Sequence, residues 1–180
     1  LDFVDLFVGH IRGGLGIVAC VTCAIIGAIS GSGFTGVAAT GPMLIPRMVE
    51  QGYPKGFATA LVTSASILGL LIPPSVIMVI YGWVTDTSIL ACFLLTLVPG
   101  VLICILMSIV NMWWCRGFNL RVVSRAEILE TRKQAIPITI KATPALLMPV
   151  IILGGIYGGV FTATEAAAVA AIYAIPIGIL

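Results

Sequence analysis

The chain has 180 residues, of which 60% are hydrophobic and only 9% are charged. Soluble domains carry about 25% charged residues, so this composition excludes a globular protein that folds in water. The formal net charge of +2 says little about partners, and no nucleic-acid partner is expected.

Long stretches of the chain contain no charged residue. Lys, Arg, Asp, Glu and His are absent from residues 13–46, 56–85, 87–115, 142–164 and 166–180. A bilayer core of roughly 30 Å needs about 20 apolar residues per helix, and every stretch except the last reaches that length. We therefore predict an all-α, polytopic membrane protein. Because the last stretch stops at Leu180 and Leu1 is no initiator, we also expect further spans on both sides.

The first stretch, residues 13–46, fits neither one crossing nor two. Its 34 uncharged residues are too many for one ordinary span and fewer than the roughly 40 that two spans need. Its middle, Ser30 to Gly36, reads SGSGFTG and is polar and glycine-rich. Two half-depth helices that meet at this polar tip resolve the conflict. We predict a re-entrant helical hairpin with Arg12 and Arg47 at its two cytoplasmic feet.

A second irregularity lies within the predicted helix 57–81. Pro73 and Pro74 have no amide hydrogen, so the carbonyls of Gly69 and Leu70 lose their helical donors. The helix is expected to stop near Leu71 and to restart around residue 75. This is a discontinuous helix, in which a short unwound segment separates two halves.

The basic residues predict the orientation. Six of the nine lie between residues 116 and 141, which places the connector 116–142 in the cytoplasm by the positive-inside rule. This connector is either an amphipathic helix at the membrane surface or a solvated linker. The transmembrane helix 87–115 then puts Asp86 outside, and 143–180 forms a further helix pair. Within that pair, Thr162 and Glu165 have the spacing of a capping box.

The two irregular segments indicate a chemistry. A broken helix offers carbonyl oxygens to a cation at one end and amide groups to a carboxylate at the other. Sodium needs about five or six neutral oxygens, and the expected donors are Ser30, Ser32, Thr35 and the carbonyls around Gly31, Gly69 and Ile72. No titratable residue lies in either segment, which favours sodium over proton coupling.

Other functions find no support. No catalytic motif points to an enzyme and no cofactor is expected. Cys20 and Cys23 have the CxxC spacing of some metal sites. In an apolar helix without a second ligand pair they are better interpreted as small buried residues. Sodium is thus the only metal ion that we expect.

Two segments resemble a known family. The first is AIIGAISGSGFTGVAATGPMLIPRMVEQGYPKGFATALVTSASILGLLIPPSVIMVIYG, and the second is GGIYGGVFTATEAAAVAAIYA. Both are similar to the large membrane subunit of the tripartite ATP-independent periplasmic (TRAP) transporters. The resemblance implies an elevator-type transporter of which this chain is half of an inverted repeat. Residues 1–86 would be part of the transport domain, and 143–180 a truncated scaffold pair of the second repeat.

The resemblance also implies site residues. The family's hairpin tip, usually SGSS, corresponds to residues 30–33, and its broken helix GxLIPPS corresponds to residues 69–75. Gly33 departs from the usual serine, which removes a hydroxyl ligand there but not a backbone one. The implied sodium-binding residues are Ser30, Gly31, Ser32, Gly69, Ile72 and Pro73. The implied substrate-binding residues are Gly33, Thr35, Pro74 and Ser75.

The implied function is sodium-coupled uptake of a small organic anion, a carboxylate, across the bacterial inner membrane, where the protein contacts membrane lipid. Its implied partners are a small four-helix membrane subunit and a periplasmic substrate-binding protein. One alternative is a sodium/dicarboxylate symporter that needs no binding protein. Another is a membrane anchor subunit that does not transport. The sequence leaves open which organic acid is carried.

Overall fold

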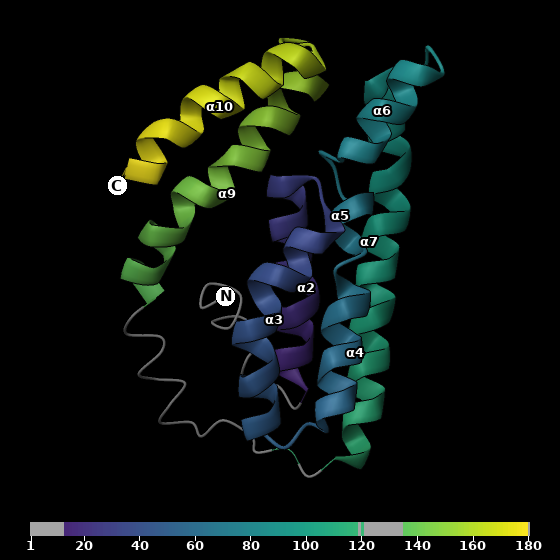
Figure 1. Ribbon diagram of the computed structural model, residues 1–180, viewed down its shortest axis with the longest axis vertical. Helices are drawn as coiled ribbons and strands as arrows, with labels where there is room; N and C mark the ends of the chain where they lie inside the picture. Colours follow the sequence, from purple (N-terminus) through teal and green to yellow (C-terminus); the bar gives the residue numbers. More distant parts are fainter. Residues whose placement is uncertain (1–12, 119, 121–134, 180) are drawn as a thin grey trace.

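The computed structural model describes residues 13–118, 120 and 135–179 (Figure 1). Every regular element in these ranges is a helix, which confirms the predicted all-α class. The elements are α2 (Gly14–Ser30), α3 (Gly33–Glu50), α4 (Lys55–Ala65), α5 (Leu68–Leu71), α6 (Val76–Val84), α7 (Ile89–Trp114), the 3₁₀ turn η1 (Cys115–Gly117), α9 (Ala135–Tyr157) and α10 (Ala163–Ile179).

The first two helices form the predicted helical hairpin, with its turn at residues 30–32. α2 ends because Gly31 adopts the left-handed conformation (φ 66°), which closes a helix without the steric penalty that a side chain would bring. The arms contain 17 and 18 residues, or about 26 Å each at 1.5 Å per residue. They are therefore longer than the half-depth helices that we expected. α3 stays helical through Pro42 and Pro46 and ends only at Glu50.

The discontinuous helix is also present. α5 ends at Leu71 and α6 begins at Val76, so the chain is unwound across the two prolines as predicted. The helices on the two sides of this break are bent by 41°. A further interruption, at Ser66 and Ile67 between α4 and α5, was not predicted because no proline or glycine marks it.

α7 is the long helix of the described region. With η1 it covers Ile89–Gly117, and its 29 residues are long and apolar enough to cross a membrane. This agrees with the predicted crossing at residues 87–115. The bent pair on either side of the break passes the same test as one span, whereas α2 and the apolar parts of α9 and α10 are shorter.

The main core surrounds α2, which packs against α3, α4, α5 and α7. Most of its apolar residues are small or branched, including Val18, Ala19, Leu44 and Val62. Cys20 and Cys23 are free and buried among them, which confirms their interpretation as small core residues. The part of the chain that the structure describes contains no group of His, Cys, Asp and Glu able to hold a metal ion.

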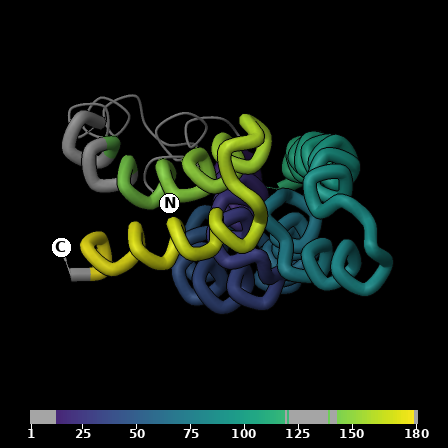
Figure 2. Tube along the Cα trace, turned by 90° about the horizontal axis from the view of Figure 1, so that it is seen from above, coloured from purple at the N-terminus to yellow at the C-terminus, as the bar shows by residue number. Residues whose placement is uncertain are grey.

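The helices α9 and α10 form a second packed unit. The Tyr173 hydroxyl donates a hydrogen bond to the Pro144 carbonyl oxygen (3.0 Å) and ties the two helices together. Their apolar faces meet Phe93 of α7 in a second core cluster. Seen from above, both helices extend to one side of the α2–α7 bundle (Figure 2).

The capping box at the start of α10 is confirmed. A carboxylate oxygen of Glu165 accepts hydrogen bonds from the Thr162 amide (2.8 Å) and hydroxyl (2.9 Å), and the same hydroxyl accepts from the Glu165 amide (3.3 Å). α9 begins at Ala135, within the predicted connector 116–142. Residues 119 and 121–134 of that connector, together with Arg12 at the predicted hairpin foot, lie outside the described residues.

Candidate binding site at the hairpin tip

The hairpin tip consists of Ser30, the last residue of α2, and of Gly31 and Ser32, which connect α2 to α3. The Gly31 amide bonds back to the Gly27 carbonyl oxygen at 2.6 Å, so α2 closes on its own last turn. Ser32 is extended and precedes α3 without a side-chain cap. The Ser30 hydroxyl accepts from the Ser32 amide and donates to the Ser32 carbonyl, both at 3.3 Å. The tip is therefore a compact loop rich in neutral oxygens.

The helix break offers the complementary groups. Ile72 has left the helical conformation (ψ 119°), although its amide still bonds to the Leu68 carbonyl at 2.8 Å. Pro73 is fully buried. Ser75 is extended and begins α6, but its hydroxyl makes no capping bond. That hydroxyl oxygen is buried, with no hydrogen-bond partner among the described residues.

The tip and the break meet, which is the condition that the predicted sodium site requires. The Val76 amide, the first of α6, donates a hydrogen bond to the Gly31 carbonyl oxygen at 3.3 Å. On the other side of the break, a Cβ atom placed on Gly69 would lie 3.0 Å from the Ser32 carbonyl oxygen. The tip thus touches both halves of the broken helix through backbone atoms.

This junction lies within the length of the long helix rather than at one of its ends. A Cβ atom on Gly100 of α7 would lie 3.2 Å from Leu71 Cβ and 3.1 Å from an Ile72 side-chain carbon. Gly100 is close to the middle of Ile89–Trp114. Figure 1 shows α7 continuing past the break in both directions. If α7 crosses a bilayer, the junction lies inside the hydrocarbon layer, where irregular backbone is tolerated only against protein or a wet cavity.

Such a cavity adjoins the junction. It has a volume of about 380 Å³, and its walls come from the tip and break on one side and from α9 and α10 on the other. The wall on the junction side includes four of the predicted site residues, namely Ser30, Gly31, Pro74 and Ser75. None of the described residues that line it is ionisable. Among the described lining residues, Ser30 and Ser75 carry the polar side chains, and the rest of the lining is largely apolar.

The remaining predicted residues are divided between two places. Ser32, Gly69, Ile72 and Pro73 lie at the junction but do not line the cavity. Gly33 is buried, and a Cβ there would lie 2.9 Å from the Ser66 carbonyl oxygen.

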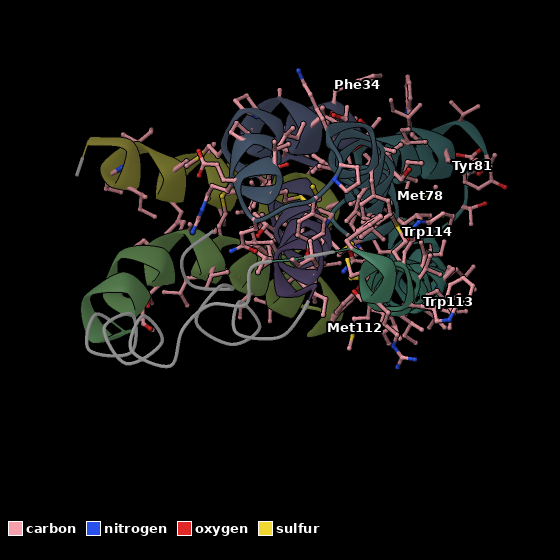
Figure 3. The ribbon with its side chains drawn as sticks, turned by 90° about the horizontal axis from the view of Figure 1, so that it is seen from below. Phe34, Met78, Tyr81, Met112, Trp113 and Trp114 are labelled. Atoms are coloured by element: carbon pink, nitrogen blue, oxygen red, sulfur yellow. The ribbon has the colours of Figure 1, made fainter. Side chains whose placement is uncertain are left out.

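Thr35 is exposed beside Phe34, whose side chain is 89% exposed (Figure 3). Thr35 thus does not share the cavity with Pro74 and Ser75 among the described residues. The reason is helical geometry, since residues 33–35 begin α3 and turn away from the tip.

The opposite wall of the cavity was not anticipated. It consists of a row of alanines on α10, among them Ala163, Ala167 and Ala174, together with Ile152 and Ile156 of α9. The spacing of Ala163, Ala167, Ala170, Ala171 and Ala174 puts them on one face of a helix, and this was the available signal. Small side chains on this face leave the space that the cavity occupies.

Comparison with known proteins identifies the family. The sequence-family model of the DctM component of the tripartite ATP-independent periplasmic transporters matches residues 1–180. The chain is 45% identical over 173 residues to the C4-dicarboxylate TRAP transporter large permease protein DctM of Pseudomonas aeruginosa, covering 96% of this chain and 40% of that protein.

Two further relatives are named for other substrates. The ectoine/5-hydroxyectoine TRAP transporter large permease protein UehC of Ruegeria pomeroyi is 42% identical, covering 100% of this chain and 41% of the relative. The isethionate TRAP transporter permease protein DctMQ of Oleidesulfovibrio alaskensis is 41% identical, and the match covers 99% of this chain and 28% of that protein. The chain thus spans about two fifths or less of the length of these relatives.

These matches confirm the resemblance that the hairpin tip and the broken helix indicated. They also confirm that the chain does not come from an enzyme, because the family is one of transporters. The chain belongs to the family of the DctM component, the large permease of TRAP transporters.

Proposed function

We propose that the full protein carries out sodium-coupled secondary active uptake of a small organic anion across the bacterial inner membrane. In this proposal the described helices contribute one half of an inverted repeat. Na⁺ binds where the hairpin tip meets the helix break, and the substrate occupies the adjacent cavity. No cofactor takes part.

The observation that carries the proposal is the junction itself. The tip supplies three neutral oxygens of the kind that suits Na⁺, the Ser30 hydroxyl and the carbonyls of Gly31 and Ser32, and its two carbonyls contact the two halves of the broken helix. Ser75 lines the same cavity as Ser30 and Gly31, and its buried hydroxyl has no hydrogen-bond partner among the described residues. A buried hydroxyl without a partner costs free energy, so its retention favours a ligand that completes its bonding. Within the described part of the chain no ionisable side chain lines the cavity, which argues against proton relay through it.

The substrate is proposed to be a small organic acid with a carboxylate or a sulfonate group. The relatives named above are described for C4-dicarboxylate, ectoine or hydroxyectoine, and isethionate, and each of these molecules carries such a group. The first amide of α6 does not provide the expected free donor for it, because the Val76 amide is bonded to Gly31. We therefore assign contact with the anion to Ser75 and the tip, with the missing half of the protein supplying the rest.

Movement is proposed to follow an elevator mechanism, in which the hairpin and broken helix travel together against α9 and α10. The alanine face of α10 supports this division, because its small side chains leave the cavity open between α10 and the tip. The apolar, outward-facing side chains of α6 and α7, including Tyr81, Trp113 and Trp114 (Figure 3), are proposed to face membrane lipid or partner subunits. The proposed partners are a small four-helix membrane subunit and a periplasmic binding protein.

Uptake in reconstituted vesicles tests the proposal. The full-length protein and its membrane partner would be reconstituted and supplied with the purified binding protein loaded with a radiolabelled organic acid. An inward sodium gradient should drive accumulation, and an equal potassium gradient should not. Uptake that is indifferent to sodium would refute the coupling.

The same vesicles separate the two alternatives. Accumulation that persists without any binding protein would favour a symporter that works alone. A non-transporting anchor predicts that Ser32→Ala or Pro73→Ala leaves uptake by the complex intact. Sodium-dependent loss of uptake in Ser32→Ala, at normal expression, would eliminate the anchor.

A further inference from the structure

Two glycines far apart in the sequence hold the hairpin against the broken helix. Gly27 in the last turns of α2 and Gly69 in α5 meet backbone to backbone. A Cβ atom on Gly27 would overlap the Gly69 Cα and would lie 2.9 Å from the Gly69 nitrogen. A Cβ atom on Gly69 would lie 2.8 Å from the Gly27 Cα. The two helices can approach this closely only because neither position has a side chain.

Each glycine is directly joined to one side of the junction. The Gly27 carbonyl accepts the amide of Gly31, the central residue of the tip, at 2.6 Å. Gly69 faces the Ser32 carbonyl oxygen, and the break begins within one turn of it. Any increase in the distance between α2 and α5 therefore moves the tip oxygens away from the break oxygens.

We propose that Gly27 and Gly69 are positioning residues that set the distance between tip and break, and that this distance pre-organises the sodium site. The inference rests on the proposed sodium coupling. Sites for small ions must be held to within about 0.5 Å of the productive geometry. A methyl group at this contact separates the backbones by more than that. The contact thus acts on ion affinity and not only on stability.

The chain offers a graded set of variants. Gly27→Ala introduces the most severe overlap, and Gly69→Ala a milder one. Gly41→Ala is the matched control in the same hairpin, because its Cβ would meet only Ile45 and Val37 side chains at ordinary distances of 3.7 and 3.9 Å. Gly→Ala inside a helix is otherwise favourable by roughly 0.5–1 kcal/mol, so the control should be folded and stable.

The measurement uses purified full-length protein and Na⁺ as the probe. The melting temperature is followed as sodium chloride replaces potassium chloride at constant ionic strength, because a ligand that binds the folded state raises it. The sodium concentration for half-maximal stabilisation should rise by about tenfold or more in Gly69→Ala, and further in Gly27→Ala, given the steep dependence of such sites on geometry. Gly41→Ala should match the wild type.

The outcomes separate this inference from the function on which it rests. Wild-type protein that sodium does not stabilise would refute both. The positioning role alone would be overturned if sodium stabilises the wild type and the folded variants Gly27→Ala and Gly69→Ala need the same sodium concentration for half-maximal stabilisation.

Hydrogen exchange of the wild type gives a second criterion, which also decides the case if neither variant accumulates. A pre-organised junction predicts that the Val76 amide exchanges slowly in sodium-free medium, because it is already bonded to Gly31. Fast exchange that becomes slow only when sodium is added would overturn the inference.

Discussion

A buried hydroxyl group without a hydrogen-bond partner lowers stability, and Ser75 carries one at the wall of the cavity. Its side chain is 1% exposed, and its oxygen has no partner among the described residues. A purely structural position of this kind would be better filled by alanine. The residue therefore gives a test in which stability and activity respond in opposite directions.

Ser75→Ala should leave the melting temperature of the full-length protein unchanged or raise it, because the unpaired hydroxyl is removed. Sodium-driven uptake should fall by about tenfold or more, the usual effect of losing one hydrogen bond to a charged ligand. Ser64→Ala, on an exposed position of α4, serves as the control. Normal uptake by Ser75→Ala would remove Ser75 from the proposed site.

Asn111 is a buried polar residue that has a structural explanation. Its side-chain nitrogen donates to the Gly13 carbonyl oxygen at 2.8 Å, although the two residues are far apart in the sequence. Gly16 has no Cβ, which leaves room for the amide, since a Cβ there would overlap it. Asn111 thus attaches the start of α2 to α7.

Asn111→Ala should lower the free energy of unfolding by about 1–3 kcal/mol, because a buried carbonyl group loses its donor. The half-saturating sodium concentration of the folded protein should not change, since Asn111 is remote from the tip. Thr96→Val is the matched control on α7, because its hydroxyl bonds only to carbonyls of its own helix, at 3.1 and 3.2 Å. A shift in sodium affinity in Asn111→Ala would contradict the structural assignment.

At the level of elements, local chemistry explains the ends of most helices. The break after Leu71 was predictable because Pro73 and Pro74 remove donors whatever surrounds them. The start of α10 was predictable because Thr162 and Glu165 satisfy each other's groups within one turn. The interruption at Ser66 carries no such signal, because no proline or glycine stands at Ser66 or Ile67.

The capping box gives a prediction for α10. Glu165→Ala should lower the melting temperature, because the free amide of Thr162 loses its acceptor. Glu165→Gln should keep most of the stability, because its side-chain carbonyl can still accept from that amide. Neither substitution should alter the sodium dependence of uptake, since Glu165 is exposed and does not line the cavity. Altered sodium dependence in Glu165→Gln, with normal melting, would indicate a coupling role instead of a cap.

At the scale of the whole molecule, the structure brings basic residues to one end. Phe57, near the start of α4, packs against Trp114 and Phe118 at the end of α7, with ring centroids 6.2 and 5.3 Å apart. The neighbouring cations Lys55 and Arg116 therefore share this end. Asp86 lies in the turn between α6 and α7 at the opposite end (Figure 1). This distribution supports the cytoplasmic assignment of the basic end.

Labelling of cysteines introduced at the two ends, in intact cells, checks the orientation. Lys55→Cys should react with a membrane-impermeant maleimide only after the cells are opened, and Asp86→Cys should react from outside. The unsubstituted protein measures the background labelling of native cysteines, and the five cysteines of this chain are buried or half-buried in the described structure. The reverse pattern would invert the proposed topology.

The sequence by itself determined the helical class, the hairpin and its polar tip, the proline break, the capping box and the family. The family follows from the resemblance of two sequence segments, and the other features depend on local chemistry or on composition: absent charges, missing amide hydrogens and residues within one helical turn. Only the tertiary structure decided that the tip bonds to Val76, that Gly27 meets Gly69, and that α9 and α10 close a cavity over Ser75. Those contacts join residues distant in the chain, and their distances follow from how the helices pack. For the same reason Thr35 was predicted to join the site, whereas the start of α3 turns its side chain away from the cavity.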